Sequence, residues 1–347
     1  MKQRLSPSLA GLLLAFLLGC TSSDPAGRVN PAPVPIVYAA GFSVNQAGFN
    51  VAMLWKDGVA IPLSDGSTHA AVRACVAVGR DLYSAGYLRN GAGFQVTTLW
   101  RNSSPTSLSN GTTNSLANGI AVSGQDVHVV GRELNLAGKA VAMYWKNGLP
   151  TALSDGSTDA FAYSVAVLNG DVYIAGFIMD KAGISTAICW RNGLPTALSD
   201  GLQAGKAYGV AAIGGDLYVC GYLTNASGVM TATFWKNGLP AALSDGTTQA
   251  DAFVPIMLGR DLCFPGYRAN PAGIWVATYW INGTQVPITD GAYDAEVFGI
   301  VRVGTDIYTA GYELTPTGGI AGKIWKNGVP QLLAAKGEAS ALLLVTE

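Results

Sequence analysis

A unit of 45 residues, repeated in register along the chain, constrains the fold more than any other feature. Its clearest copy runs from Tyr163 to Gly201. A period of roughly 40–50 residues without insertions is typical of propeller blades and is longer than most solenoid repeats. One tryptophan marks each copy, 45 residues after the one before it: Trp55, Trp100, Trp145, Trp190, Trp235, Trp280 and Trp325.

Each unit is predicted to form four antiparallel strands. In the clearest copy, Asn169-Gly170 and Asn192-Gly193 each separate two apolar runs. Asn-Gly is a strong hairpin signal because both residues tolerate the positive φ of a type I′ turn. The predicted strands are 163–168, 171–177, 184–191 and 194–199.

The two ends of the repeated region complement each other. Residues 37–42 match the second strand of the unit, so the first copy lacks a first strand, and residues 341–345 match a first strand alone. A C-terminal strand that completes the first blade would close a ring and leave no open sheet edge, whereas a solenoid would carry polar caps. We therefore predict an all-β fold over 36–347, a seven-bladed β-propeller with four-stranded antiparallel blades.

Part of the unit resembles a known type of blade. The run VAVLNGDVYIAGF (165–177) resembles the first two strands of a kelch-type blade, and Trp190 lies later in the unit, as a kelch tryptophan does. Kelch blades carry a Gly-Gly pair, however, whereas Gly176 is followed by Phe177. The resemblance implies that the first strand of each blade lines a central channel, and it carries over no binding residues.

The N-terminus resembles that of bacterial lipoproteins. Lys2 and Arg4 precede an apolar stretch at 9–18 that is too short to span a bilayer stably. Leu17-Leu18-Gly19-Cys20 resembles a lipobox, which implies that 1–19 is a signal peptide and that Cys20 becomes acylated. Thr21, rather than Asp, implies retention at the outer membrane. An ordinary signal peptide is the alternative.

The segment between the lipobox and the repeats is predicted to be a tether. Residues 20–35 contain four prolines and no apolar periodicity, which favours an extended chain. The implied location is the cell envelope, with the membrane as a partner through the lipid anchor.

Composition and motifs exclude several function classes. Only 12% of residues are charged and the net charge is −1, so no nucleic-acid partner is expected. The sequence contains no Gly-x-Ser-x-Gly, His-Glu-x-x-His or Cys-x-x-Cys motif, and we assign no catalytic residue. Four cysteines occupy strand positions that are apolar in other copies, so they are expected to be buried thiols: Cys75, Cys189, Cys220 and Cys263.

The recurring aspartates are expected to stabilise turns. A calcium site needs several oxygens from one loop, whereas each Ser-Asp-Gly sequence supplies one carboxylate, so we expect neither a metal nor another cofactor. Asp171, which follows a hairpin turn, is expected to bind adjacent backbone.

A ligand site is expected where the copies differ, because residues common to all copies are explained by packing and turns. The copies differ most at the entry to the first strand, in columns that should ring one mouth of the channel. Their aromatic and charged side chains suit a sugar, a peptide or a cation. The predicted ligand-binding residues are Arg73, Asn118, Asp159, Tyr163, Lys206, Tyr208, Asp251, Phe253, Glu296 and Phe298.

Two functions remain open from the sequence. The first is a non-enzymatic binding or scaffold lipoprotein whose ligand is a glycan, a peptide or an envelope protein. The alternative is a propeller hydrolase or lyase that acts on glycans with a carboxylate pair at the mouth. The candidates for such a pair are Asp159, Asp251, Asp294 and Glu296.

Overall fold

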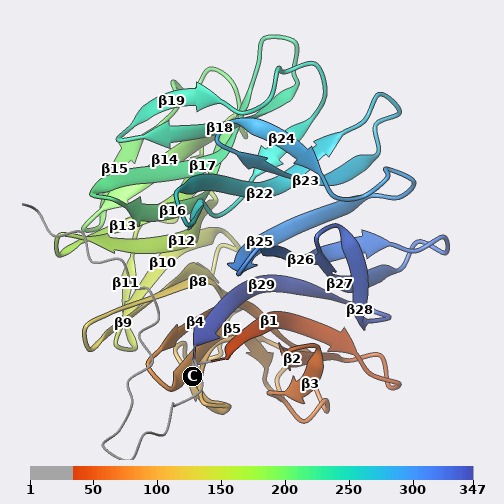
Figure 1. Cartoon of the computed structure of the whole chain (residues 1–347). Helices are drawn as coiled ribbons and strands as arrows, with labels where there is room; N and C mark the ends of the chain where they lie inside the picture. The colour runs from red at the N-terminus through yellow and green to blue at the C-terminus, as the bar shows by residue number, and fades with distance from the viewer. Residues whose placement is uncertain (1–33, 347) are drawn as a thin grey trace, which may run out of the picture.

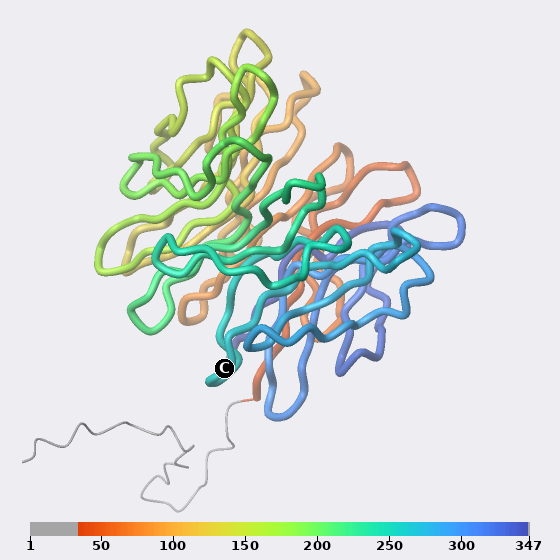
Figure 2. The backbone as a smooth tube through the Cα atoms, turned by 90° about the horizontal axis from the view of Figure 1, so that it is seen from above, coloured from red at the N-terminus to blue at the C-terminus, as the bar shows by residue number. Residues whose placement is uncertain are grey.

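The computed structural model describes residues 34–346 and consists of strands arranged in seven sheets around a central axis (Figure 1). The red-orange first blade lies beside the blue last blade in both views (Figure 2). The seven-bladed propeller predicted from the period is therefore confirmed. Within 34–346, no helix is long and apolar enough to cross a membrane.

Blades 1 to 4 each contain four strands, named in order from the innermost to the outermost. Blade 1 consists of β29 (Gly337–Thr346), β1 (Pro35–Val44), β2 (Asn50–Lys56) and β3 (Val59–Pro62). Blade 2 consists of β4 (Ala70–Val78), β5 (Asp81–Arg89), β6 (Gln95–Arg101) and β7 (Ser104–Ser107). Blade 3 consists of β8 (Ser115–Ser123), β9 (Asp126–Leu134), β10 (Ala140–Lys146) and β11 (Leu149–Ala152). Blade 4 consists of β12 (Ala160–Leu168), β13 (Asp171–Met179), β14 (Ser185–Arg191) and β15 (Leu194–Ala197).

Blades 5 to 7 follow the same plan, except that the inner strand of blade 6 is split. Blade 5 consists of β16 (Gly205–Ile213), β17 (Asp216–Thr224), β18 (Met230–Lys236) and β19 (Leu239–Ala242). Blade 6 consists of β20 (Ala250–Ala252) and β21 (Ile256–Leu258), then β22 (Asp261–Ala269), β23 (Trp275–Ile281) and β24 (Thr284–Pro287). Blade 7 consists of β25 (Ala295–Val303), β26 (Asp306–Leu314), β27 (Ile320–Lys326) and β28 (Val329–Ala334).

The C-terminal strand closes the ring as predicted. β29 pairs antiparallel with β1 from Pro35↔Thr346 to Ser43↔Gly337. The strand starts at Gly337, four residues before the expected run at 341–345. Its earlier start brings Glu338 and Ser340 into blade 1.

The tryptophan column forms the packing between blades. All seven of these side chains are at most 2% exposed. Trp190 of blade 4 donates a hydrogen bond from Nε1 to the carbonyl of Leu153 in blade 3 at 3.0 Å. Trp100 and Trp235 bond the preceding blade in the same way, through Leu63 and Leu198. Each of these three tryptophans thus combines a large buried apolar surface with one hydrogen bond, and together they determine the relative orientation of neighbouring blades.

A bulge in the inner strand explains the glycine that recurs in every second strand. In blade 4, Ala162 pairs with Gly176 and Ser164 with Ala175, so Tyr163 is an extra residue. A β-carbon at Gly176 would lie 1.9 Å from the carbonyl oxygen of Phe161, far inside contact distance. The corresponding distance is between 1.8 and 2.0 Å in the other blades, at Gly41, Gly86, Gly131, Gly221, Gly266 and Gly311. Only glycine allows the two strands to approach this closely beside the bulge.

The turns differ in one respect from expectation. Asp65 and its counterparts accept the N–H two residues further on, as expected for turn aspartates. Asp171, however, accepts a bond from Asn192 Nδ2 and pairs with Arg191, while the N–H of Val172 donates to Asn192 Oδ1 at 2.9 Å. The expectation that Asp171 binds backbone is therefore wrong. Asn192 of the next turn binds the backbone instead: its amide oxygen accepts the N–H of Val172, while its amide nitrogen donates to the Asp171 carboxylate.

The four strand cysteines are free thiols, as expected. Cys189, Cys220 and Cys263 are buried, and Cys75 is partly buried. Burial raises the pKa of the Cys75 and Cys189 thiols to about 12, so both stay protonated and unreactive at neutral pH.

The glycine column can be tested with a matched pair of alanine variants. Gly176→Ala should lower the free energy of unfolding by about 3 kcal/mol or more, because its methyl group meets backbone oxygen and Trp190 Cζ3. Gly91→Ala in a surface loop has open space and no positive φ, so we expect a change within about 0.5 kcal/mol. Chemical denaturation of both variants measures the difference, and equal stabilities would contradict the bulge argument.

Candidate functional site

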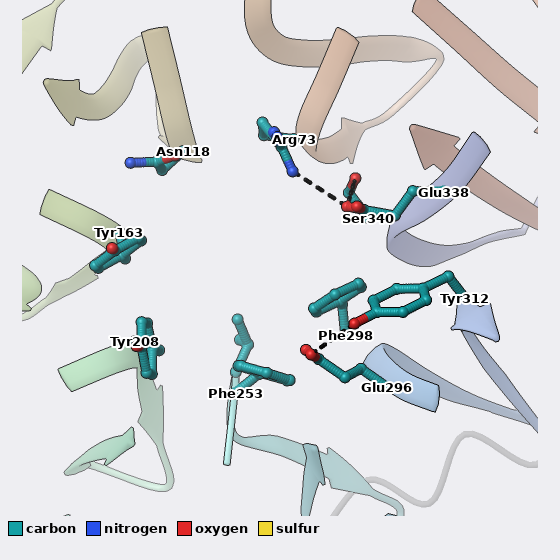
Figure 3. Close-up of a pocket in the computed structure, with 11 residues that line it drawn as sticks. Arg73, Asn118, Tyr163, Tyr208, Phe253, Glu296, Phe298, Tyr312, Glu338 and Ser340 are labelled. Atoms are coloured by element: carbon teal, nitrogen blue, oxygen red, sulfur yellow. Dashed lines mark hydrogen bonds and ion pairs between the residues drawn. The ribbon is translucent and has the colours of Figure 1, made fainter. Parts of the chain in front are cut away.

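A cavity of about 410 Å³ lies at one mouth of the central channel, and we call it the mouth pocket. Figure 3 shows its side chains arranged around one opening, with Arg73, Glu338 and Ser340 opposite the rings of Tyr163, Tyr208 and Phe253, and with Glu296 beside Phe298 and Tyr312. Its lining residues are Arg73, Asn118, Tyr163, Tyr208, Phe253, Val254, Glu296, Phe298, Tyr312, Glu338 and Ser340.

The inner-strand bulges build this pocket. The strand register shifts by one residue at the same place in each blade, and the extra residue lines the pocket. In split blade 6, three residues separate Ala252 from Ile256 where the partner strand has two, so this blade also carries an extra residue. The seven bulge residues, one from each blade, are Arg73, Asn118, Tyr163, Tyr208, Phe253, Phe298 and Ser340.

Four consecutive bulge residues are aromatic, and we call Tyr163, Tyr208, Phe253 and Phe298 the aromatic arc. Their successive ring centroids lie 4.9, 5.8 and 5.1 Å apart, with interplanar angles of 63°, 68° and 46°. The inclined rings present both faces and edges to the pocket. Burial raises the pKa of Tyr163 to about 12 and raises that of Tyr208 further, so both hydroxyl groups stay neutral at physiological pH.

The opposite side of the pocket is polar and is held by hydrogen bonds. Arg73 donates from Nη1 to Glu338 Oε1 at 3.1 Å, and Ser340 Oγ donates to the same oxygen at 2.6 Å. Asn118 donates from Nδ2 to the carbonyl of Ala162 at 2.9 Å. Arg73 and Glu338 therefore neutralise each other across the junction of blades 2 and 1.

Glu296 is the second carboxyl group of the pocket, and its environment is different. It accepts a hydrogen bond from the Tyr312 hydroxyl at 2.8 Å, and within residues 34–346 it forms no ion pair. Burial raises the pKa of Glu296 to about 7; Glu338 and Asp294 add to the increase, while the bond from Tyr312 opposes it. Glu296 is thus poised to change its charge near neutral pH.

Three of the ten predicted ligand-binding residues lie outside the pocket lining. Asp159 accepts the N–H of Ala140 at 2.8 Å, which attaches the entry of one blade to the preceding blade. Lys206 Nζ lies over the Phe177 ring, 4.6 Å from its centroid. Asp251 is only 4% exposed and accepts the N–H of Ala252 at 2.8 Å, and its burial raises its pKa.

Lys206 and Asp251 lie outside the pocket lining, and each precedes the bulge of its inner strand instead of occupying it. They pair directly across their sheets with Tyr222 and Tyr267. Lys206 contacts the Phe177 ring of the neighbouring blade, and Asp251 is buried. Glu296 holds the same position in blade 7 but still reaches the pocket. The other seven predicted residues line the pocket: Arg73, Asn118, Tyr163, Tyr208, Phe253, Glu296 and Phe298.

Sequence reasoning missed four lining residues, Val254, Tyr312, Glu338 and Ser340. Ser340 follows Phe298 by 42 residues, so a strict 45-residue step arrives at Leu343 instead. A local sequence pattern could have located Ser340, because the bulge residue is often flanked by small residues. Ala339-Ser340-Ala341 matches Ala117-Asn118-Gly119 and Ala207-Tyr208-Gly209 in this respect.

The inner strands continue below the pocket as a narrow apolar channel. A second cavity of about 210 Å³ shares several bulge residues with the mouth pocket. Its deeper lining is mainly aliphatic: Ile120, Val165, Val210, Ile256, Ile300 and Leu342. Within residues 34–346 no group of three or more His, Cys, Asp or Glu side chains is placed to hold a metal ion.

Comparison with solved structures shows the propeller fold in other proteins. A puromycin-hydrolyzing peptidase of Mycobacterium tuberculosis superposes with a TM-score of 0.57 at 12% identity, over 87% of this chain and 53% of that one. A puromycin hydrolase in complex with PGG gives a TM-score of 0.58 at 12% identity, over 89% and 54%. This chain spans about half the length of each, and at such identity the likeness shows the fold alone. No protein-family model matches the sequence, and no curated protein matches it.

The raised pKa of Glu296 has a consequence for stability. Its folded-state value of about 7 exceeds the ordinary 4.5, so its favourable contribution to the free energy of unfolding is complete below pH 4.5 and is lost as pH rises through 7. Glu296→Gln is neutral at every pH. The difference in free energy of unfolding, variant minus wild type, should therefore grow by at most about 3 kcal/mol between pH 5 and 8. Urea denaturation at both pH values measures it, and a difference that is independent of pH would show that Glu296 is not perturbed.

Proposed function

We propose that this chain is a binding protein of the cell envelope that receives its ligand in the mouth pocket. One observation carries the proposal: the bulge residues that line the pocket change from blade to blade, while the tryptophan and glycine columns beside them do not. Packing requires the constant columns. The variable ring, in contrast, satisfies no packing rule common to the seven blades, and recognition of a ligand accounts for it.

The dimensions and chemistry of the pocket suit this role. Its volume of about 410 Å³ lies within the range of small-molecule sites, roughly 300–1,000 Å³. The aromatic arc offers apolar surface, and Arg73, Asn118 and Ser340 offer directional polar groups. A small glycan or peptide, or a side chain of an envelope protein, fits this combination. The blades would then act as a kelch-like scaffold for the site.

The proposed location rests on the N-terminal sequence. Cys20, the expected site of acylation, lies outside the described residues, as do the signal peptide and most of the tether. The stretch Leu17-Leu18-Gly19-Cys20 supports attachment to the outer membrane by lipid.

A glycan hydrolase or lyase is the second candidate, and one observation favours it. Glu296 and Glu338 both line the pocket but have different partners: Tyr312 donates a hydrogen bond to Glu296, whereas Arg73 forms an ion pair with Glu338. Two carboxyl groups in unlike environments are the usual arrangement for an acid and a charged partner in glycoside hydrolysis. Asp251, one member of the pair considered from the sequence, is buried outside this lining.

The pocket can be tested with glycan and peptide libraries against the purified protein. A ligand found there should bind about tenfold more weakly, or worse, to Phe253→Ala and Tyr208→Ala, because each aromatic anchor contributes roughly 1–3 kcal/mol. Tyr293→Ala is the matched control, since Tyr293 is exposed outside the pocket. Normal binding to both arc variants would place the ligand elsewhere. Release of a cleaved product, lost in Glu296→Gln, would favour the hydrolase.

The lipid anchor is tested independently of the ligand. Cys20→Ala should leave the precursor unprocessed or release the protein from the membrane, because no thiol remains to be acylated. Membrane fractionation with intact-mass measurement detects either outcome. Unchanged mass and unchanged fractionation of the variant would refute the anchor.

A further inference from the structure

We propose that the ligand of the mouth pocket is a small organic cation, an ammonium compound with an aromatic or aliphatic body, and that Glu296 provides its counter-charge. This inference rests on the proposed binding function and specifies its ligand class. It depends on the charge balance of the pocket, on the rings that surround it and on the position of Glu296.

Among residues 34–346, the charge balance of the pocket leaves one carboxyl group without a cationic partner. The pocket lining contains three ionisable charges, those of Arg73, Glu296 and Glu338. Arg73 and Glu338 form an ion pair at 3.1 Å, and Glu338 is 13% exposed in its side chain. Glu296 bonds the neutral hydroxyl of Tyr312. A ligand cation would complete this arrangement, whereas an anion would face uncompensated negative charge as soon as Glu296 ionises.

The aromatic arc provides the second requirement for a cation. Aromatic faces attract a cation within about 6 Å of the ring centroid, and quaternary ammonium groups are commonly recognised by several rings together. Tyr163, Tyr208, Phe253 and Phe298 follow one another without a gap around the pocket. The arc ends beside Glu296 in blade 7, where Phe298 lies 6.0 Å from Tyr312 between ring centroids. Rings and carboxyl group therefore face the same space, as Figure 3 shows.

A neutral sugar uses this arrangement less completely. It can stack on a ring, but it leaves the Glu296 carboxyl group protonated or unpaired. An ammonium group gains from both the rings and the carboxylate, and its apolar body can point toward the aliphatic channel below. The structure therefore favours the cation over the glycan.

Binding of a cation should depend on pH in a defined direction. A bound cation favours the ionised form of Glu296, so binding releases the proton that this group holds below about pH 7. Affinity for a cation of fixed charge should thus increase about tenfold from pH 6 to pH 8. The groups that shift the pKa of Glu296 are all acidic or phenolic: Glu338 and Asp294 raise it, and the hydrogen bond from Tyr312 lowers it. Glu296 in turn raises the pKa of Asp251 and of Tyr267, which lie on strands of blade 6.

Three probes with one ring each separate charge from shape. We would titrate the full protein by calorimetry with benzyltrimethylammonium, benzyl alcohol and benzoate at pH 6 and pH 8. The charge of the quaternary ion does not titrate, so any pH dependence of its binding comes from the protein. At pH 8, benzyltrimethylammonium should bind at least about tenfold more tightly than the alcohol, and benzoate should bind most weakly.

Two variants identify the group responsible. Glu296→Gln keeps the size of the side chain and should remove both the preference for the cation and the pH dependence, while binding of benzyl alcohol persists. Asp180→Asn is the matched control. It removes one carboxylate from a surface loop and installs the residue found at the same position in blades 1, 2, 3, 5 and 6, namely Asn45, Asn90, Asn135, Asn225 and Asn270. Its binding should equal that of wild type.

The outcomes separate this inference from the proposed function. If benzyl alcohol binds as tightly as the cation and Tyr208→Ala abolishes its binding, the pocket is a binding site and the cation inference is overturned. If Asp180→Asn loses as much affinity for the cation as Glu296→Gln does, the charge effect comes from the protein surface in general, and the cation inference is overturned. Failure of benzyltrimethylammonium to bind at tens of millimolar contradicts the cation, and the library experiment then decides the binding function by itself.

Discussion

The close approach of a glycine to a backbone carbonyl is the contact on which this structure depends. At Gly176 and at its equivalent in every other blade, a β-carbon would lie 2.0 Å or less from the carbonyl oxygen on the inner strand. This approach allows the inner strand to carry one residue more than its partner. The extra residue leaves the sheet pairing and turns toward the channel mouth. One steric requirement, repeated seven times, therefore produces the ring of side chains that lines the mouth pocket.

The sequence was sufficient for the architecture because its period and its ends carry independent information. The tryptophans specify the repeat, and the unmatched strand at 341–345 specifies the closure. It was insufficient for the site in two respects. A strict period misplaces the last bulge residue, Ser340, because the final step is shorter. Sequence columns also cannot show that Asp251 is buried while Glu296, at the same position in blade 7, lines the pocket.

The constant and variable positions of the blade have different roles: the tryptophan packs between blades, and the bulge residue lines the pocket. The tryptophan joins neighbouring blades mainly through burial, which all seven copies share. Trp100, Trp190 and Trp235 add a hydrogen bond to the preceding blade, whereas within residues 34–346 the buried Nε1 atoms of Trp145 and Trp280 have no partner. The bulge residue is free to vary because its side chain projects into the opening instead of packing in the sheet. Arg73, Tyr208 and Phe298 can occupy equivalent positions without altering the fold. A repeated scaffold can therefore change its ligand without changing its core.

Closure of the ring is also a condition for the pocket itself. Arg73 and Glu338 are 265 residues apart in sequence, yet they form the ion pair of the polar side. Glu338 and Ser340 belong to β29, so this side exists only when the C-terminal strand has paired with β1. A ligand that contacts both sides binds only the closed ring and stabilises it in proportion to RT ln(1 + [L]/Kd). Ligand recognition and ring closure are thus thermodynamically coupled, and the junction between the first and last blades is where that coupling acts.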